Sequence, residues 1–256
     1  MPHPDLMNPD EAKERYIPEI DGSITFLNKE LGLVKKDFES IAAEGDESIY
    51  NDYKFRSGII MLYARWEGMV KSLWEICISY INATTQEGTK LNPSFHPLAF
   101  YSLSKSQAGT IKSLKMRIEE LGSVKSHLSF VDSIYENFNF KKIDQKSISQ
   151  SISSSNLNWK QFELFNSTLG IPMETYRPIG PPNITNWEED INQLVEIRNI
   201  FAHGSLSESP IELDTSEKLI ETVREVIERF KTEIQNIIEN DLHQLGENLQ
   251  ITEADS

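Results

Sequence analysis

The sequence predicts an all-α protein, an elongated antiparallel bundle of long helices. In several long segments apolar residues recur in alternating steps of three and four, and no segment shows the two-residue alternation of a strand. No internal repeat is found. The chain has 256 residues, 38% of them hydrophobic and 25% charged, which suffices for one sizeable core. We therefore expect a single helical domain over residues 1–256.

The first helix is expected to begin at Asn8, where an Asn cap, a Pro and two acidic residues follow one another. Pro18 and Gly22 are expected to kink or delay its first turns. Its apolar residues have the 3.5-residue spacing of a long packed helix or a short coiled-coil seam. This stripe consists of Ile17, Ile20, Ile24, Leu27, Leu31, Val34, Phe38 and Ile41.

A second helix is expected from about Tyr53 to Asn82. Apolar residues cover most of its circumference, which is typical of a helix at the centre of a bundle. Trp66 and Trp74 are expected to lie in the core rather than to stack on nucleotide bases. One stripe consists of Ile59, Leu62, Trp66, Met69, Leu73, Ile76 and Tyr80, and a second of Ile60, Tyr63, Val70, Trp74, Cys77 and Ile81.

The middle of the chain is less regular. Helical stretches are expected at about 96–121 and 125–138, and a short helix at 159–169. Irregular insertions at about 83–95 and 139–184 are rich in Ser, Asn, Gly or Pro. Residues 246–256 are expected to form a disordered tail.

Two capped helices complete the predicted bundle. Thr185 and Glu188 fit a capping box that opens a helix ending at Gly204. Asp214 and Glu217 are expected to open the last helix in the same way. Its stripe again steps by three and four residues and consists of Ile220, Val223, Ile227, Phe230, Ile234 and Ile237.

The chain is strongly acidic, with 40 acidic and 25 basic side chains and a formal net charge of −15. This charge argues against a basic surface that wraps around duplex nucleic acid. In residues 54–142, however, basic side chains outnumber acidic ones. Lys112, Lys115 and Lys125 in this stretch are candidates for binding an anionic substrate; the alternative is a solvated basic face that pairs with acidic neighbours.

Several classes of protein are not expected. The most apolar stretch, residues 59–81, is interrupted by charged side chains, so no membrane span is predicted. The single cysteine, Cys77, and an N-terminus unlike a signal peptide predict a cytoplasmic protein. The five histidines are too scattered for a zinc site, and no phosphate loop or nucleophile elbow occurs, so no metal or cofactor is expected.

The segment that carries chemistry is Arg198-Asn199-Ile200-Phe201-Ala202-His203-Gly204, at the end of a capped helix. His203 exchanges protons near neutral pH, and a helix C-terminus favours its protonated form. Arg198 offers a charged fork that matches two phosphate oxygens. Asn199 lies four residues before His203, on the same face, where its amide can orient the imidazole or bind phosphate. Arg198 is about 140° from His203 on an ideal helix, so the two converge only if the last turn distorts or a second subunit contributes.

Each residue of the segment also has an ordinary structural explanation. Arg198 can form a salt bridge to Glu188 or Glu196, and His203 can end the helix by bonding a carbonyl. These alternatives stay open at the level of the sequence.

The second helix adds two further candidates. Glu67 lies in an otherwise apolar helix and is a candidate to orient His203 or Arg198 across the bundle; the alternative is an exposed pair with Lys71 four residues later. Tyr63 either contacts substrate or packs in the core.

The Arg198–Gly204 segment resembles the motif of the HEPN superfamily of small helical-bundle proteins, many of which are metal-independent endoribonucleases with an Arg, a polar residue, then three to five residues and a His. The stretch from Arg56 to Gly68, which ends in Arg-Trp-Glu-Gly, is similar to the opening of the MAE-type toxin-like branch. The resemblance spans about residues 10–245.

The resemblance implies a homodimer with apposed helix ends that cuts single-stranded RNA through the 2′-hydroxyl. It also implies a toxin or effector of a prokaryotic defence or toxin–antitoxin module, with a co-encoded antitoxin or defence subunit as a further partner. Two other functions stay open. One is a catalytically silent HEPN module that binds RNA or protein, and the other is a regulatory subunit of a co-encoded nuclease, for which the net charge suits mimicry of nucleic acid.

Overall fold

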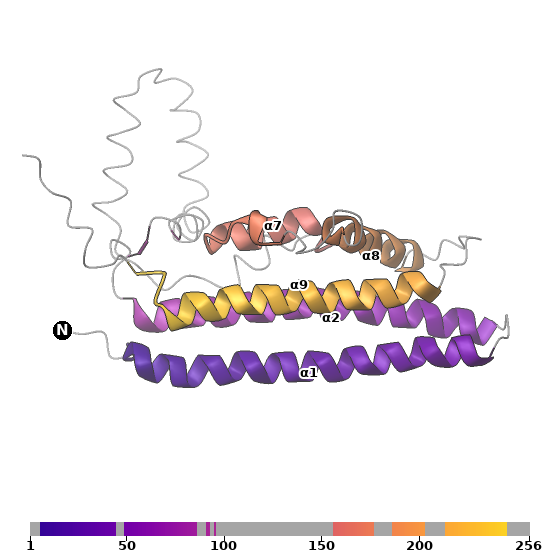
Figure 1. The fold of residues 1–256 in the computed structure, drawn as a ribbon, viewed down its shortest axis with the longest axis horizontal. Coiled ribbons are helices and arrows are strands. Elements are labelled where there is room, and N and C mark those ends of the chain that lie inside the picture. Colours follow the sequence, from indigo (N-terminus) through magenta and orange to yellow (C-terminus); the bar gives the residue numbers. More distant parts are fainter. Residues whose placement is uncertain are drawn as a thin grey trace, which may run out of the picture.

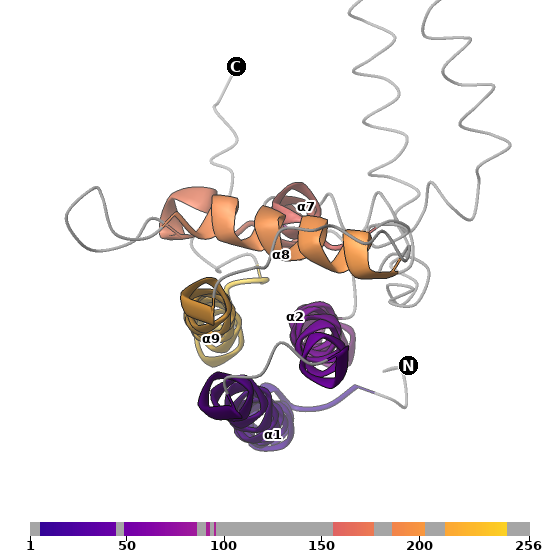
Figure 2. The same cartoon turned by 90° about the vertical axis from the view of Figure 1, so that its right-hand side faces the viewer.

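The computed structural model describes residues 6–44, 49–85, 91–92, 95, 156–176, 186–202 and 213–244. Three long helices, α1 (Pro9–Glu44), α2 (Ile49–Thr84) and α9 (Leu213–Glu239), run side by side along the long axis (Figure 1). Figure 2 shows that the three long helices form a triangular bundle, with α7 (Trp159–Thr168) and α8 (Trp187–Ala202) on the side away from α1 and α8 running across α2 and α9.

The all-α prediction is confirmed. In the described residues, the regular structure consists of these helices, a short 3-10 helix at Met173–Tyr176 and an isolated bridge between Leu91 and Gln244. The stretches expected to be helical at 96–121 and 125–138, and the tail at 246–256, lie outside the described residues.

Helix α1 begins where the sequence places it, because Asn8 caps it: its Oδ1 accepts the Asp10 N–H at 2.9 Å. The expected delay of the first turns at Pro18 and Gly22 is wrong, since α1 begins at Pro9 and continues through both residues. Pro18 lies on the exposed face, so the buried stripe on the other face holds the helix together. That stripe is buried at Ile20, Ile24, Leu27, Leu31, Val34 and Phe38.

Helix α2 is the centre of the bundle and is longer at both ends than the sequence indicated. It packs against α1, α8 and α9. Both of its apolar stripes are buried with one exception, Ile60, which is 39% exposed. Trp66 and Trp74 are fully buried, as predicted.

The regular stripes of α1 and α9 are used inside one chain. The stripe of α9 is buried from Ile220 to Ile237, and α1 and α9 pack against each other and against α2. The 3.5-residue spacing therefore reflects packing within the protomer, and a dimer surface has to be sought on other side chains.

Aromatic side chains join α7 to the long helices. The Phe162 ring lies 5.2 Å from that of Trp66 in α2 and 5.4 Å from that of Phe230 in α9, measured between ring centres. Trp74 of α2 contacts Phe165 and donates its indole N–H to the Thr168 hydroxyl at 2.9 Å. These contacts fix α7 on the core and confirm the short helix expected at 159–169.

A polar cluster closes one end of the bundle. Asp241, which follows α9, accepts hydrogen bonds from Lys13 of α1 at 2.6 Å and from the Tyr80 hydroxyl of α2. His243 is fully buried beside Tyr80, and its Nε2 lies 2.9 Å from the Thr84 hydroxyl. The end of α9 is thus tied to the start of α1 and the end of α2.

Two glycines of α2 provide a matched test of the packing. A methyl group at Gly58 would lie 2.6 Å from the buried Phe38 ring, whereas one at Gly68 would meet nothing within 4 Å. We expect Gly58→Ala to destabilise the protein by about 1–3 kcal/mol and Gly68→Ala to stabilise it by about 0.5–1 kcal/mol. Urea unfolding measures both changes, and equal effects would contradict the close contact of α1 with α2 at Gly58.

The buried histidine makes stability depend on pH. Burial lowers the pKa of His243 to about 4; the charge of Asp241 opposes this shift and that of Lys13 adds to it. Between this value and about 6.5 the unfolded chain binds more protons, so stability falls by up to about 1.4 kcal/mol per pH unit as the solution is acidified. His243→Gln removes this contribution. Its stability difference from wild type, measured by urea unfolding, is expected to shrink from about pH 7 to about pH 5; a constant difference would contradict the assignment.

Candidate functional site

Helix α8 carries the predicted motif, and its start is capped one residue later than expected. Asn186, not Thr185, is the cap: its Oδ1 accepts the Glu189 N–H at 3.3 Å, and its Nδ2 donates to the Glu189 carboxylate. Both residues are good caps, so the sequence did not fix the register. Likewise α9 begins at Leu213, which places Asp214 inside the first turn.

A buried carboxylate fixes α8 to α9. Asp190 has no exposed surface and accepts hydrogen bonds from Lys218 at 2.6 Å and from the Thr222 hydroxyl at 2.9 Å. A buried carboxylate needs such partners. On the same side, Trp187 donates its indole N–H to Glu225 at 3.0 Å. The first turn of α8 therefore has a defined position on α9.

The last turn of α8 rests on the first half of α2. Phe201 contacts the Phe55 ring edge to face at 6.4 Å, and the Arg56 guanidinium lies 5.3 Å from the centre of the Phe201 ring. The described part of α8 ends at Ala202. His203, the next residue, lies outside the described residues, so its predicted catalytic role stays a prediction.

Residues 156–158, which we call the linking segment, lie between α2 and α8. The Leu157 N–H donates to the Tyr63 hydroxyl at 2.7 Å, and the Leu157 carbonyl accepts the Trp66 indole N–H at 2.8 Å. Just beyond the segment, the Trp159 N–H donates to Asn192 of α8 at 3.1 Å. The segment is thus bonded to both helices through its backbone or its immediate neighbour.

Arg198 lies at the junction of α8, α2 and the linking segment. Its guanidinium is 4.7 Å from the centre of the Tyr63 ring, a cation–π distance. Its Nη1 donates to Asn156 Oδ1 at 2.7 Å and to Asn199 Oδ1 at 3.0 Å. The salt bridges to Glu188 or Glu196 that the sequence left open are not seen among the described residues. Within the same part of the chain, no acceptor contacts its Nε and Nη2 atoms.

The unoccupied Nε and Nη2 edge allows Arg198 to bind an anion. The Nε–H and one Nη2–H of a guanidinium lie side by side and match two oxygens of a phosphate. Because one corner of the guanidinium is hydrogen-bonded and one face is stacked, the direction of the open edge is set by the protein. The cluster is therefore suited to hold a phosphate group.

The buried Tyr63 ring forms the surface on which the Arg198 guanidinium lies. The Tyr63 side chain is 2% exposed, which corresponds to the core alternative rather than to direct contact with substrate. Burial raises the pKa of Tyr63 to about 12; the hydrogen bond from Leu157 and the charge of Arg198 oppose this shift, and the nearby carboxylate of Glu67 adds to it. Tyr63 is consequently a neutral phenol at physiological pH.

Glu67 forms the ion pair with Lys71 that the sequence offered as the ordinary alternative. The pair is partly buried, and the carboxylate lies close enough to the Tyr63 hydroxyl, beside the Arg198 cluster, for its charge to raise the pKa of that group. Both roles proposed for Glu67, in orienting Arg198 and in pairing with Lys71, are thus compatible with one position.

The structure brings together four of the predicted residues: Arg198, Asn199, Tyr63 and Glu67. Lys112, Lys115 and Lys125 lie outside the described residues, as does His203. Asn156 is a member of the cluster that sequence reasoning missed. It stands in a Ser- and Asn-rich stretch with no periodicity, so no local signal distinguishes it.

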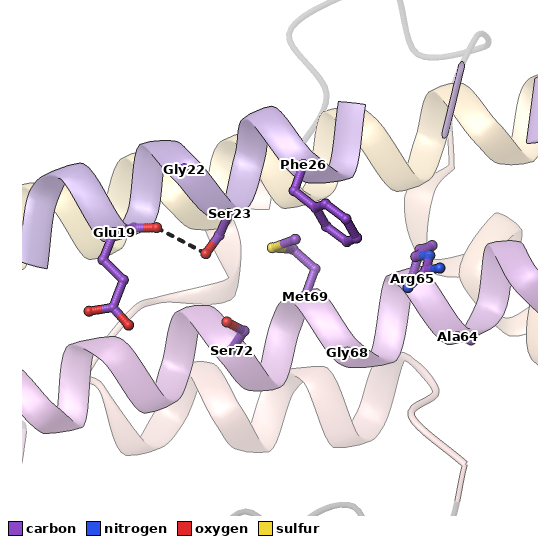
Figure 3. Close-up of a pocket in the computed structure, with 9 residues that line it drawn as sticks. All are labelled: Glu19, Gly22, Ser23, Phe26, Ala64, Arg65, Gly68, Met69 and Ser72. Carbon is purple, nitrogen blue, oxygen red and sulfur yellow. Dashed lines mark hydrogen bonds between the residues drawn. The ribbon is translucent and has the colours of Figure 1, made fainter. Parts of the chain in front are cut away.

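A separate pocket lies between α1 and α2 (Figure 3) and shares no residue with the Arg198 cluster. Its volume is about 450 Å³. Of its charged residues, Arg65 is already paired with Glu30 at 2.6 Å. The pocket is lined by Glu19, Gly22, Ser23, Phe26, Ala64, Arg65, Gly68, Met69 and Ser72.

The described residues contain no group of three or more His, Cys, Asp or Glu side chains suited to hold a metal ion. None of their helices combines the length and the apolar character that a membrane span requires.

Comparison with known proteins identifies a family. The family model described as RiboL-PSP-HEPN matches residues 23–236, which include α2, the linking segment, α8 and most of α9. Searches of curated proteins and of solved structures gave no match.

Proposed function

The chain belongs to the RiboL-PSP-HEPN family, a HEPN family, and from this premise we propose that it is a metal-independent endoribonuclease acting on single-stranded RNA. HEPN proteins are often ribonucleases. The observation that best supports this activity is the Arg198 guanidinium, which is anchored at Nη1 by two carboxamides and stacked on Tyr63, with its bidentate edge open.

In the proposed reaction, the 2′-hydroxyl oxygen attacks the adjacent phosphorus and the bond to the 5′-oxygen breaks. The products are a 2′,3′-cyclic phosphate and a 5′-hydroxyl. One group removes the 2′-hydroxyl proton and another protonates the leaving 5′-oxygen. His203 is proposed to take part in this proton transfer. Arg198 binds two phosphate oxygens and stabilises the charge that develops on them.

The other cluster residues have supporting roles in this proposal. Asn199 holds the Nη1 corner of Arg198 through the same Oδ1 that accepts from Asn156. Glu67 acts on the cluster through the Tyr63 hydroxyl. Lys112, Lys115 and Lys125 are proposed to guide the RNA by charge alone.

We further propose that the protein is an effector of a prokaryotic defence or toxin–antitoxin module, of the MAE-type branch, controlled by a co-encoded partner. This role is supported by the resemblance of the Arg56–Gly68 and Arg198–Gly204 segments. A silent RNA-binding module is the function that replaces the nuclease if the site binds RNA without cleaving it.

The nuclease proposal is tested by RNA cleavage in EDTA. We expect wild type to cleave, His203→Ala to lose about 10²–10⁴-fold or more of the rate, and Arg198→Lys to lose at least about 10-fold, because lysine keeps the charge but lacks the fork. The exposed, intrahelical pair of Arg224 with Glu221 offers the control Arg224→Lys, which is expected to cleave normally. Unchanged cleavage by His203→Ala, or a requirement for a divalent ion, would refute the proposal.

We also propose that the active form is a homodimer. The apolar stripes are used inside the protomer, but Ile60 and Met61 of α2 are 39% and 41% exposed, and they lie within one turn of Tyr63. A partner surface that covers them would form an isologous interface on the half of α2 that also carries Tyr63 and the Arg198 cluster.

The dimer is tested by sedimentation of Met61→Glu. A buried charge without a partner at an apolar interface is costly, so this variant is expected to be a monomer with impaired cleavage. Leu164→Glu, at a residue of α7 that is 47% exposed, is the matched control and should leave the oligomeric state unchanged. A wild-type protein that is monomeric at micromolar concentration and still cleaves RNA would disprove this proposal.

A further inference from the structure

Asn156 joins the two polar groups of α8 into a closed arrangement. Its Oδ1 accepts from Arg198 at 2.7 Å, and its Nδ2 donates to Asn199 Oδ1 at 2.7 Å. Since Asn199 also accepts from Arg198, each of the three side chains is bonded to the other two. The two hydrogens of Nη1 are both used in this arrangement.

This arrangement fixes the plane of the guanidinium. An arginine side chain has many rotamers, and contact with the Tyr63 ring alone leaves the guanidinium free to turn. The two bonds at Nη1 remove that freedom, and they point the Nε and Nη2 edge away from the carboxamides. Asn199 is adjacent in sequence to Arg198, so the only anchor supplied from outside α8 at this corner, among the described residues, is Asn156.

We propose that Asn156 is a positioning residue that aims the open edge of Arg198 at an RNA phosphate. The inference rests on the proposed function for the identity of the ligand. The substrate does not touch Asn156; the residue acts through Arg198 and Asn199. Its backbone position does not depend on its side chain, because Leu157 and Trp159 carry the bonds that hold the linking segment to α2 and α8.

The opposite role, competition of Asn156 with phosphate for Arg198, fits the geometry less well. A competitor would occupy the edge that chelates phosphate, whereas Asn156 and Asn199 both bind the remaining corner. A neutral amide is also a weaker partner for a guanidinium than a phosphate is.

A double-mutant cycle tests the proposal. Asn156→Ala is compared with wild type, and the same change is made in the Arg198→Lys protein. Cleavage is measured as kcat/KM in EDTA, and affinity is measured for a mixed-sequence 2′-O-methyl RNA, which binds but lacks the attacking hydroxyl. Asn240→Ala is the control for loss of an amide, since Asn240 is exposed and, in the described part of the chain, its amide contacts Asn236 of α9 and no other residue.

We expect Asn156→Ala to lower kcat/KM by roughly 10- to 100-fold with Arg198 present, since misdirected catalytic groups lose rates of this order. In the Arg198→Lys background, the same change is expected to cost less than about 2-fold, because lysine has no plane to orient. The affinity for 2′-O-methyl RNA should follow the same pattern. Asn156→Asp, which keeps the shape of the side chain but not the donor to Asn199, should melt as wild type does and still lose cleavage.

Three results would overturn the inference. Equal losses in both backgrounds would mean that Asn156 supports the fold, and a gain on Asn156→Ala would mean that it competes with substrate. If the wild-type protein does not bind 2′-O-methyl RNA, an RNA phosphate is not the ligand of Arg198. If wild type binds this RNA but cleaves no RNA, the nuclease proposal fails alone, and the affinities still decide the role of Asn156.

Discussion

Most of the circumference of α2 is apolar, so other segments of the chain must cover this helix along most of its length. α1 and α9 form a bundle of three long helices with α2, and a second layer, made of α7, α8 and the linking segment, covers α2 on the side away from α1 (Figure 2). Covering a helix this completely also buries the polar atoms of its aromatic residues. The Tyr63 hydroxyl and the indoles of Trp66 and Trp74 are each bonded to a group from the second layer, because an unpaired buried donor or acceptor is costly.

The candidate site is formed by the same packing of α8 and the linking segment on α2. α8 and the linking segment meet over Tyr63, and Arg198 is placed where a buried aromatic ring, two carboxamides and solvent adjoin. The position of Arg198 therefore depends on core packing as well as on its own helix. A cation held in this way is pre-organised, and pre-organised charge stabilises developing negative charge without further rearrangement.

Much of the fold follows from the sequence because periodicity is a local property. The stripes of α1 and α9, the cap at Asn8 and the short helix α7 were all predicted from neighbouring residues. The exposure of Ile60 was not, since apolar residues cover most of the circumference of α2 and the pattern does not reveal which of them stay uncovered. The motif residues Arg198 and Asn199 are adjacent in sequence and were found, whereas Asn156 joins them from 42 residues away from Arg198. That contact exists only after the second layer has packed on α2.

Three indole N–H groups donate to chemically different acceptors, and each of these hydrogen bonds crosses a different contact, or seam, between two parts of the fold. Trp66 donates to a backbone carbonyl of the linking segment, Trp74 to a hydroxyl of α7, and Trp187 to a carboxylate of α9. The shift of an indole proton depends on its acceptor, so a nitrogen-edited spectrum of the four tryptophans contains a separate resonance for each of these seams. The molecule thus carries its own spectroscopic labels, and the signal of Trp66 reports on the segment that also holds Arg198.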